Sequence, residues 1–201
     1  MERDYKTVVF GGEWNIGKSS MFIYHWYGEQ NPQYIPTKVD PYNVDEYPVG
    51  ENGEILKVSF IDNEGGGEDW PRLRHLGYLM ANAVVLCFSI AAPETFELIE
   101  EYWYPFTQKH CPTAKLFLLS TKKDLRNDEK VIRELSKADE RPVTYNQGKN
   151  MANKIGAIGY YECSTRLGEG VEEIFKASAK AAYGTIDPKP KLYRKRKCLI
   201  M

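Results

Sequence analysis

The sequence predicts an α/β fold, in which a doubly wound, mostly parallel sheet lies between two layers of helices. Short runs that are almost wholly apolar alternate along the chain with amphipathic stretches, and near-continuous apolar runs are typical of strands covered on both faces. Strand–helix alternation favours parallel pairing, because each helix returns the chain to the same edge of the sheet. The length of 201 residues fits one such domain with a single sizeable core.

The elements follow one another in a regular order. Strands are predicted at residues 6–10, 55–61, 84–90, 115–120 and 159–163. Helices are predicted at residues 18–27, 94–108, 147–155 and 170–183. In the last helix, Val171, Ile174 and Phe175 begin an apolar stripe that would pack on the sheet. Asn52-Gly53 predicts a hairpin turn before the second strand.

Charge divides the chain into two parts. Residues 1–188 carry 21 basic and 28 acidic groups, a net charge of −7, whereas six basic residues crowd the last thirteen positions. We therefore predict a folded domain at 1–184 and a flexible polybasic tail at 185–201. The tail suits an anionic surface as partner, and the acidic body argues against nucleic acid.

Several classes of protein are excluded by composition. The longest apolar runs have strand length, too short for a transmembrane helix. The first five residues are too polar for a signal peptide. The four cysteines show no paired spacing, so neither a disulfide framework nor a zinc site is indicated, and we expect a cytosolic protein.

A phosphate-binding loop is predicted at residues 12–19, which read G-x-x-x-x-G-K-S between a strand and a helix. Backbone N–H groups of such a loop wrap phosphates, Lys18 reaches the outer phosphates, and the Ser19 hydroxyl suits Mg²⁺. The candidate phosphate-binding residues are Glu13, Trp14, Asn15, Ile16, Gly17, Lys18, Ser19 and Ser20.

Two further segments predict which base is bound. Thr121-Lys122-Lys123-Asp124 directly follows a strand, at the sheet edge where ligands bind in such folds. The Asp124 carboxylate can accept two hydrogen bonds from the N1–H and amine of guanine, a pair that adenine lacks, and the Lys122 stem can lie along the base. The remaining candidates for base contact are Thr121, Leu125, Ser164, Thr165 and Arg166, of which the last three follow the final strand and can offer backbone N–H groups to guanine O6.

A third group of residues suits a metal ion and the γ-phosphate. Asp62 and Gly65 form D-x-x-G at the end of a strand, where the acid can hold a Mg²⁺-bound water and the glycine amide can approach the phosphate. Tyr34 and Thr37 lie in the loop before that strand, and Thr37 can complete the Mg²⁺ coordination, which would make the loop a switch. A nucleotide kinase is the competing class, but it needs an arginine-rich lid that the sequence does not show.

With these motifs, the chain resembles the Rho branch of the Ras superfamily of small GTPases over nearly its whole length. Residues 34–37 resemble its switch I and residues 68–74 its switch II, and further similar segments lie at 103–105, 121–128 and 155–160. Residues 125–142 are long enough for the extra helix of the Rho branch. The resemblance implies a P-loop small GTPase fold with a Rho-type insert helix, bound GTP or GDP, and Mg²⁺.

The same resemblance implies partners. In the GTP-bound state, effectors, often cytoskeletal regulators, would bind the 34–42 and 68–76 segments, which form switch I and switch II. An exchange factor or a GDP-dissociation inhibitor would be a further partner.

Two departures affect hydrolysis. Members that hydrolyse GTP carry Gly where this chain has Trp14, and Gln where it has Gly66. That Gln orients the attacking water, and an arginine finger of a partner must meet it. The catalytic pair is therefore not intact, and the chain resembles the Rnd-like, GTPase-deficient members. The alternative is a conventional cycling GTPase in which Trp14 packs outward and Glu64 or Glu68 positions the water.

Nucleotide retention is a separate question. An aromatic side chain commonly packs on the sugar–base edge from just before switch I, where this chain has Gln30. Trp26 or Tyr27 could substitute, and if neither does, nucleotide exchange would be fast.

The chain ends with Cys198-Leu199-Ile200-Met201, a C-a-a-X box for prenylation of Cys198. One prenyl chain binds membranes weakly, and the basic tail supplies the second signal. We expect the protein at the cytoplasmic face of the plasma membrane or an internal membrane, and in the cytosol when unprenylated.

Overall fold

The computed structural model describes residues 5–28, 44–49, 54–63 and 75–185. The predictions for Tyr34, Thr37, Gly65, Gly66 and Cys198 lie outside these residues. No helix in the described ranges is long and apolar enough to cross a membrane.

One six-stranded sheet organises the molecule, in the order β2-β3-β1-β4-β5-β6. Strand β2 pairs antiparallel with β3, and all other pairs are parallel. The strands are β1 Lys6–Gly11, β2 Val44–Val49, β3 Glu54–Asn63, β4 Ala83–Ser89, β5 Lys115–Thr121 and β6 Gly159–Glu162. The predicted fold class and all five predicted strands are confirmed. Strand β2 is the partner that the predicted hairpin required, although the turn itself lies outside the described residues.

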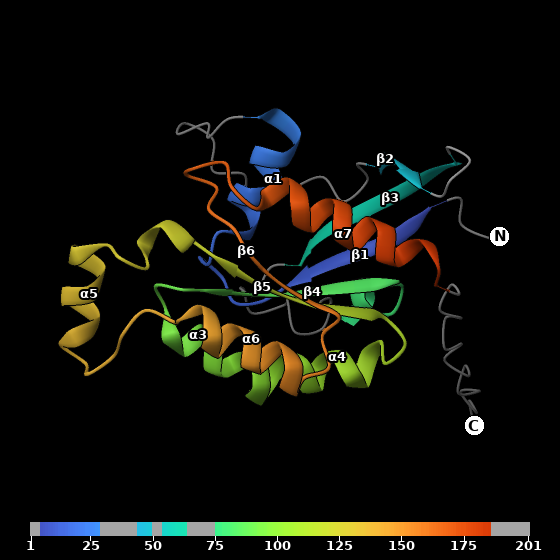
Figure 1. The fold of residues 1–201 in the computed structure, drawn as a ribbon. Helices are drawn as coiled ribbons and strands as arrows, with labels where there is room; N and C mark the ends of the chain where they lie inside the picture. Colours follow the sequence, from blue (N-terminus) through green and yellow to red (C-terminus); the bar gives the residue numbers. More distant parts are fainter. Residues whose placement is uncertain (1–4, 29–43, 50–53, 64–74, 186–201) are drawn as a thin grey trace, which may run out of the picture.

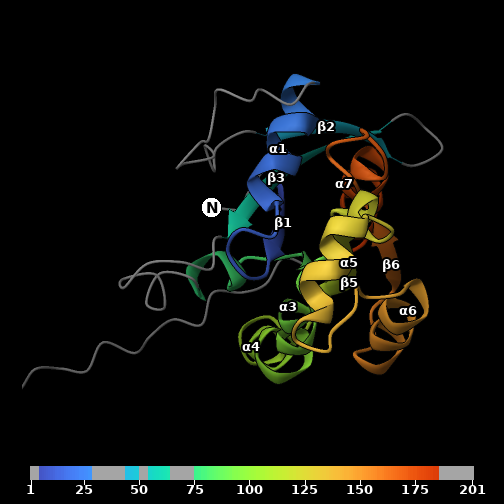
Figure 2. The same ribbon diagram turned by 90° about the vertical axis from the view of Figure 1, so that its left-hand side faces the viewer.

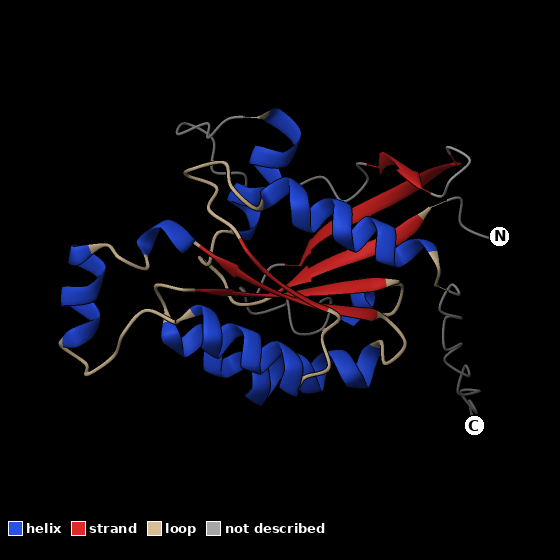
Figure 3. Cartoon of the chain, in the orientation of Figure 1, coloured by secondary structure: helices blue, strands red, loops and turns tan. Residues whose placement is uncertain are grey.

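Helices cover both faces of the sheet (Figures 1 and 3). Helices α1 Lys18–Tyr27 and α7 Val171–Tyr183 lie on one face, and α3 Pro93–Leu98, α4 Tyr104–His110 and α6 Tyr145–Lys154 on the other. Helix α5 Glu129–Ser136, the predicted insert helix, lies at one end of the molecule and faces the viewer in Figure 2.

The helix predicted at 94–108 is interrupted. A π-helical turn, Ile99–Trp103, separates α3 from α4, and the Tyr104 amide bonds to the Ile99 carbonyl five residues back. Pro105 has no N–H to continue the regular α-helical ladder, which accounts for the change of hydrogen-bonding pattern. The sequence prediction of one continuous α-helix was wrong at this point.

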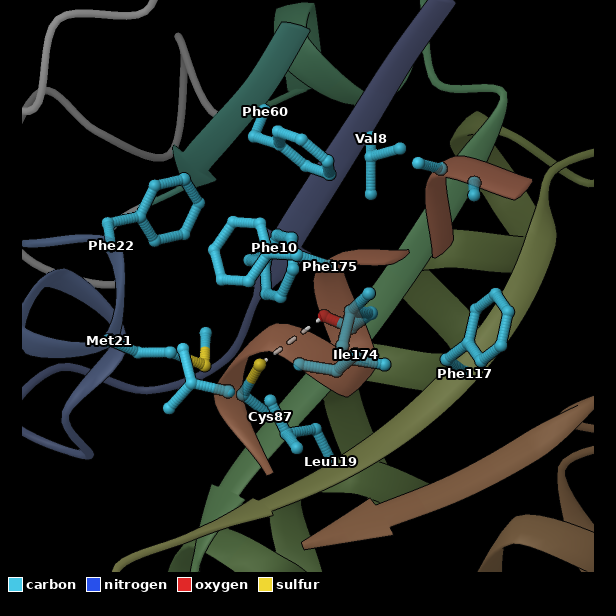
Figure 4. Packing of buried hydrophobic residues seen from close by; sticks show 14 of the residues in the cluster. Val8, Phe10, Met21, Phe22, Phe60, Cys87, Phe117, Leu119, Ile174 and Phe175 are labelled. Atoms are coloured by element: carbon cyan, nitrogen blue, oxygen red, sulfur yellow. Dashed lines mark hydrogen bonds between the residues drawn. The ribbon is translucent and has the colours of Figure 1, made fainter. Parts of the chain in front are cut away.

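Two apolar clusters, one on each side of the sheet, hold the layers together. On the α1–α7 side, the Phe175 ring stacks on Phe10 with centroids 4.9 Å apart and meets Phe22 and Phe60 edge-on (Figure 4). The opposite cluster includes fully buried Trp103 and, from β4, Val84, Leu86 and Phe88. Together they fix the carboxyl ends of the parallel strands, where the candidate site lies.

Candidate functional site

The predicted phosphate loop joins β1 to α1. Gly12 and Gly17 have φ angles of +148° and +98°, which favour glycine. A Cβ atom on Gly12 would lie 2.3 Å from the Cys87 carbonyl oxygen of β4. The loop therefore passes so close to the sheet that only glycine fits at residue 12.

Lys18 closes this loop from within. Its side chain is only 4% exposed, and Nζ donates to the carbonyls of Gly12 (3.0 Å) and Glu13 (2.7 Å). Within the described residues, no side chain caps the first turn of α1, and that turn contains no acid. Its free N–H groups and a buried ammonium thus converge, as an anion such as phosphate requires.

Ser19 and Asp62 meet beside the loop. Ser19 Oγ donates to Asp62 Oδ2 at 2.6 Å. The other carboxylate oxygen, Oδ1, is shielded from solvent and has no hydrogen-bond partner among the described residues. Burial raises the pKa of Asp62, and Lys18 and Ser19 oppose that shift. A hydroxyl beside an unsatisfied carboxylate is a donor set that fits Mg²⁺.

The segment after β5 is attached to the phosphate loop. The Thr121 hydroxyl donates to the Ile16 carbonyl (2.5 Å), and Lys122 Nζ donates to the Asn15 carbonyl (2.8 Å). Lys122 itself has a left-handed backbone, with φ +56°. Burial lowers the pKa of Lys122, and the charge of Asp124 partly opposes this. The two predicted nucleotide-binding segments therefore form one continuous surface.

The third segment, after β6, closes the base end of the site. Buried Ser164 donates from Oγ to Asp124 Oδ1 at 2.6 Å, and the Lys123 amide donates to the Cys163 carbonyl at 3.0 Å. Leu125 ends the short 3-10 turn after Lys122, and of the residues after Ser164, Thr165 is half-buried and Arg166 exposed. Hydrogen bonds thus join the phosphate loop to the segment after β5, and that segment to the one after β6.

Comparison with known proteins agrees with this geometry. The family described as "Ras family" matches residues 6–184. Over 198 residues the chain is 35% identical to GTP-binding protein rho5 of Schizosaccharomyces pombe, covering 98% of this chain and 97% of that relative. The chain belongs to the Rho family of small GTPases. Membership of this family accounts for a phosphate-binding loop at residues 12–19 beside a predicted guanine-binding segment at residues 121–124.

The two aromatic residues considered for contact with the sugar in this Rho-family protein have different surroundings. Trp26 is half-buried, donates from Nε1 to both Asp45 oxygens (3.2 and 3.3 Å) and packs on Phe22. Tyr27, at the end of α1, is 71% exposed. Trp26 is thus engaged with β2 and the core, whereas the Tyr27 ring is exposed at the end of α1.

Sequence reasoning missed a contact from the far face of the sheet. Trp103, at the end of the π-helical turn, donates from Nε1 to Glu13 Oε1 at 3.2 Å. The contact spans ninety positions and depends on the interrupted helix, so no local pattern could have indicated it. It fixes the side chain next to Trp14 in the phosphate loop.

Proposed function

We propose that this Rho-family protein is a membrane-anchored signalling switch that binds GTP with Mg²⁺ and hydrolyses it weakly or not at all. The residue that carries the proposal is Trp14 on the phosphate loop. Its indole is 69% exposed, as the cycling alternative also expects, so the residue type at this position matters here and not its exposure. Trp14 stands where hydrolysing members carry glycine, and by sequence Gly66 stands where they carry the water-orienting Gln.

The part of the predicted binding site that the structure describes lies around Trp14. Lys18 and the α1 amides would face the phosphates, and Asp124 would face the base. Ser19 would hold Mg²⁺ directly and Asp62 through a water, and the ion would neutralise charge on the β- and γ-phosphates. Binding is thus supported by fixed groups, whereas no polar side chain at position 14 or 66 can orient the attacking water.

An exposed indole also affects catalysis by a partner. An arginine finger contributes about 10³–10⁵ in rate in related GTPases, and it must approach the γ-phosphate past this loop. The side chain of neighbouring Glu13 is held by Trp103. We therefore expect a GTPase-activating protein to be ineffective, and the protein to remain available to effectors.

Membrane anchoring is supported by the start of the tail. Thr185, the last described residue, accepts from Lys6 Nζ (3.0 Å) through its carbonyl and from Asn82 Nδ2 (2.9 Å) through its hydroxyl. Both partners lie at the amino-terminal ends of parallel strands, opposite the nucleotide edge. A prenyl group on Cys198 and the basic tail would therefore anchor the side of the protein remote from the nucleotide.

Single-turnover GTP hydrolysis by the purified protein tests the proposal. We expect slow or absent phosphate release in the wild type, no stimulation by a Rho GTPase-activating protein, and GTP as the co-purifying nucleotide. The Trp14→Gly/Gly66→Gln variant should hydrolyse faster by about tenfold or more. Both proteins should bind a non-hydrolysable GTP analogue equally well, which serves as the control.

The cycling alternative makes the opposite prediction. Three results would overturn the proposal that GTP hydrolysis is weak or absent. They are wild-type hydrolysis at the rate of a cycling GTPase, strong stimulation by the activating protein, and GDP as the co-purified nucleotide. In that case another carboxylate, such as Glu64 or Glu68, would position the water.

A further inference from the structure

A bidentate ion pair lies directly behind the base end of the site. Arg126 Nη1 and Nη2 donate to Glu162 Oε2 (2.8 Å) and Oε1 (2.6 Å). The side chains are only 25% and 13% exposed. Bidentate, charge-assisted pairs are short and directional, so this pair sets a fixed distance between the two backbones.

The pair joins the two segments that are predicted to hold guanine. Arg126 lies two residues after Asp124, and Glu162 two residues before Ser164. Asp124 and Ser164 are themselves joined at 2.6 Å. A change in the distance between Arg126 and Glu162 would therefore move the Asp124 carboxylate relative to the Ser164 backbone.

Further contacts hold the ion pair in place. The Tyr160 hydroxyl donates to Glu162 Oε1 (2.6 Å) and lies 3.1 Å from Ser120 Oγ on β5. The ring packs against Gly148 of α6, where a Cβ atom would lie 2.2 Å from the tyrosine oxygen. Arg126 Nε donates to the Val143 carbonyl at 3.1 Å, which ties the chain returning from α5 to the same group.

The charges of the pair are mutually stabilised. Burial by itself raises the pKa of Glu162, but the hydrogen bonds from Arg126 and Tyr160 outweigh it and hold the pKa below its usual value. Hydrogen bonding to Glu162 raises the pKa of Arg126. Removal of either partner would leave a partly buried charge without its counter-ion, a costly arrangement.

We propose that Arg126 and Glu162, supported by Tyr160, are positioning residues for guanine recognition. They are not among the residues predicted to contact the nucleotide, but they fix the spacing of the two base-binding segments and so control discrimination for guanine and retention of the nucleotide. This inference rests on the proposed binding of guanine nucleotides.

Inosine diphosphate is the informative probe. Hypoxanthine keeps the N1–H and O6 of guanine but lacks the exocyclic amine, so it loses one of the two hydrogen bonds to Asp124. A well-placed carboxylate discriminates strongly between GDP and IDP, because an unmade hydrogen bond leaves a polar group unsatisfied. A displaced carboxylate discriminates less, whereas general destabilisation weakens both nucleotides alike.

The experiment measures dissociation rates of fluorescent GDP and affinities of GDP and IDP, at fixed Mg²⁺, for the full chain. The variants are Arg126→Gln, Glu162→Gln and their combination, with Arg126→Lys and Tyr160→Phe as milder changes should the first two fold poorly. We expect Arg126→Gln to release GDP about tenfold faster, which corresponds to about 1.4 kcal/mol, and to lower the GDP/IDP affinity ratio about threefold or more. The double variant should lose about as much as either single variant, because the pair acts as a unit.

Arg133→Gln is the matched control. Arg133 pairs with Glu129 on the exposed surface of α5 at 3.9 Å, and loss of such a pair should leave both readouts unchanged. An unchanged GDP/IDP ratio in folded variants of Arg126 and Glu162 would overturn the inference and leave the proposed function intact. Failure of the wild type to bind fluorescent GDP would overturn both.

Discussion

At the scale of single residues, the backbone at Gly12 shows how closely the phosphate loop is fitted to the sheet. Gly12 and Gly28 both have positive φ angles, +148° and +74°. A Cβ on Gly12 would collide with the Cys87 carbonyl, whereas no atom of the described residues lies within 4 Å of a Cβ on Gly28. The two glycines therefore separate the cost of backbone conformation from the cost of a steric clash.

Alanine at these two positions should give very different results. We expect Gly12→Ala to lower the free energy of unfolding by about 3 kcal/mol or more and to abolish nucleotide binding, because the loop must move off β4. Gly28→Ala should cost only about 1 kcal/mol, the usual penalty for a left-handed non-glycine residue. Urea unfolding and fluorescent GDP binding check both. Equal losses in the two variants would show that the contact with Cys87 does not constrain the loop.

At the scale of elements, a buried histidine joins α1, β2 and α7. His25 is 8% exposed, and its ring stacks on Phe175 with centroids 3.9 Å apart. Nδ1 contacts Glu172 of α7 at 2.7 Å, and Nε2 contacts Asp45 and the Tyr47 hydroxyl of β2, both at 3.1 Å. The group is placed to carry a positive charge between two carboxylates.

The contacts of His25 with Asp45 and Glu172 predict that the free energy of unfolding depends on pH. Burial opposes the charge, but the hydrogen bonds to Asp45 and Glu172 outweigh it and raise the pKa of His25 above 6.5. The stabilisation is therefore full below pH 6.5 and is lost as the pH rises through the folded-state value. Urea unfolding of the wild type between pH 6 and 9 should show this decline, at a slope of no more than about 1.4 kcal/mol per pH unit.

The control is a variant that lacks the titrating ring. The His25→Phe protein keeps the ring stacking on Phe175 and should show a flatter stability profile over the same range. If the wild type and His25→Phe show parallel profiles, the imidazole does not carry the charge inferred for it.

At the scale of the whole molecule, α5 lies outside both apolar clusters. No side chain of α5 is buried, and Asp128 caps its start by accepting from the Lys130 and Val131 amides. A helix of eight residues with no buried face has little stability of its own. Among the described residues, the free energy of unfolding therefore depends on the sheet and on the helices packed against its two faces, α1, α3, α4, α6 and α7.

Substitutions in α5 and in the larger apolar cluster test whether α5 contributes to global stability. Ile132→Gly/Glu134→Gly should weaken α5, at about 1 kcal/mol for each glycine, yet lower the global free energy of unfolding by less than about 1 kcal/mol, because α5 can unravel locally. Phe175→Ala, in the centre of the larger cluster, should cost about 3–5 kcal/mol. Urea midpoints and hydrogen exchange distinguish the two. A loss in the α5 variant as large as that of Phe175→Ala would place α5 in the cooperative core.

The sequence by itself determined the fold class and five of the six described strands, and it predicted the residues of the candidate site. This was feasible because the signals are local: apolar runs define strands, and Lys18, Ser19 and Asp124 lie in short motifs whose backbone geometry creates the chemistry. The insert helix was likewise visible from the length of residues 125–142, and α5 occupies Glu129–Ser136.

Only the tertiary structure decided which distant side chains support these motifs. It showed that Trp103 holds Glu13, that Trp26 is committed to Asp45, and that Arg126 pairs with Glu162. The physical reason is that hydrogen bonds and ion pairs depend on distances of a few ångströms between residues 19 to 90 positions apart. A pattern of residue types carries no information about such distances until strand order and helix packing bring the partners together.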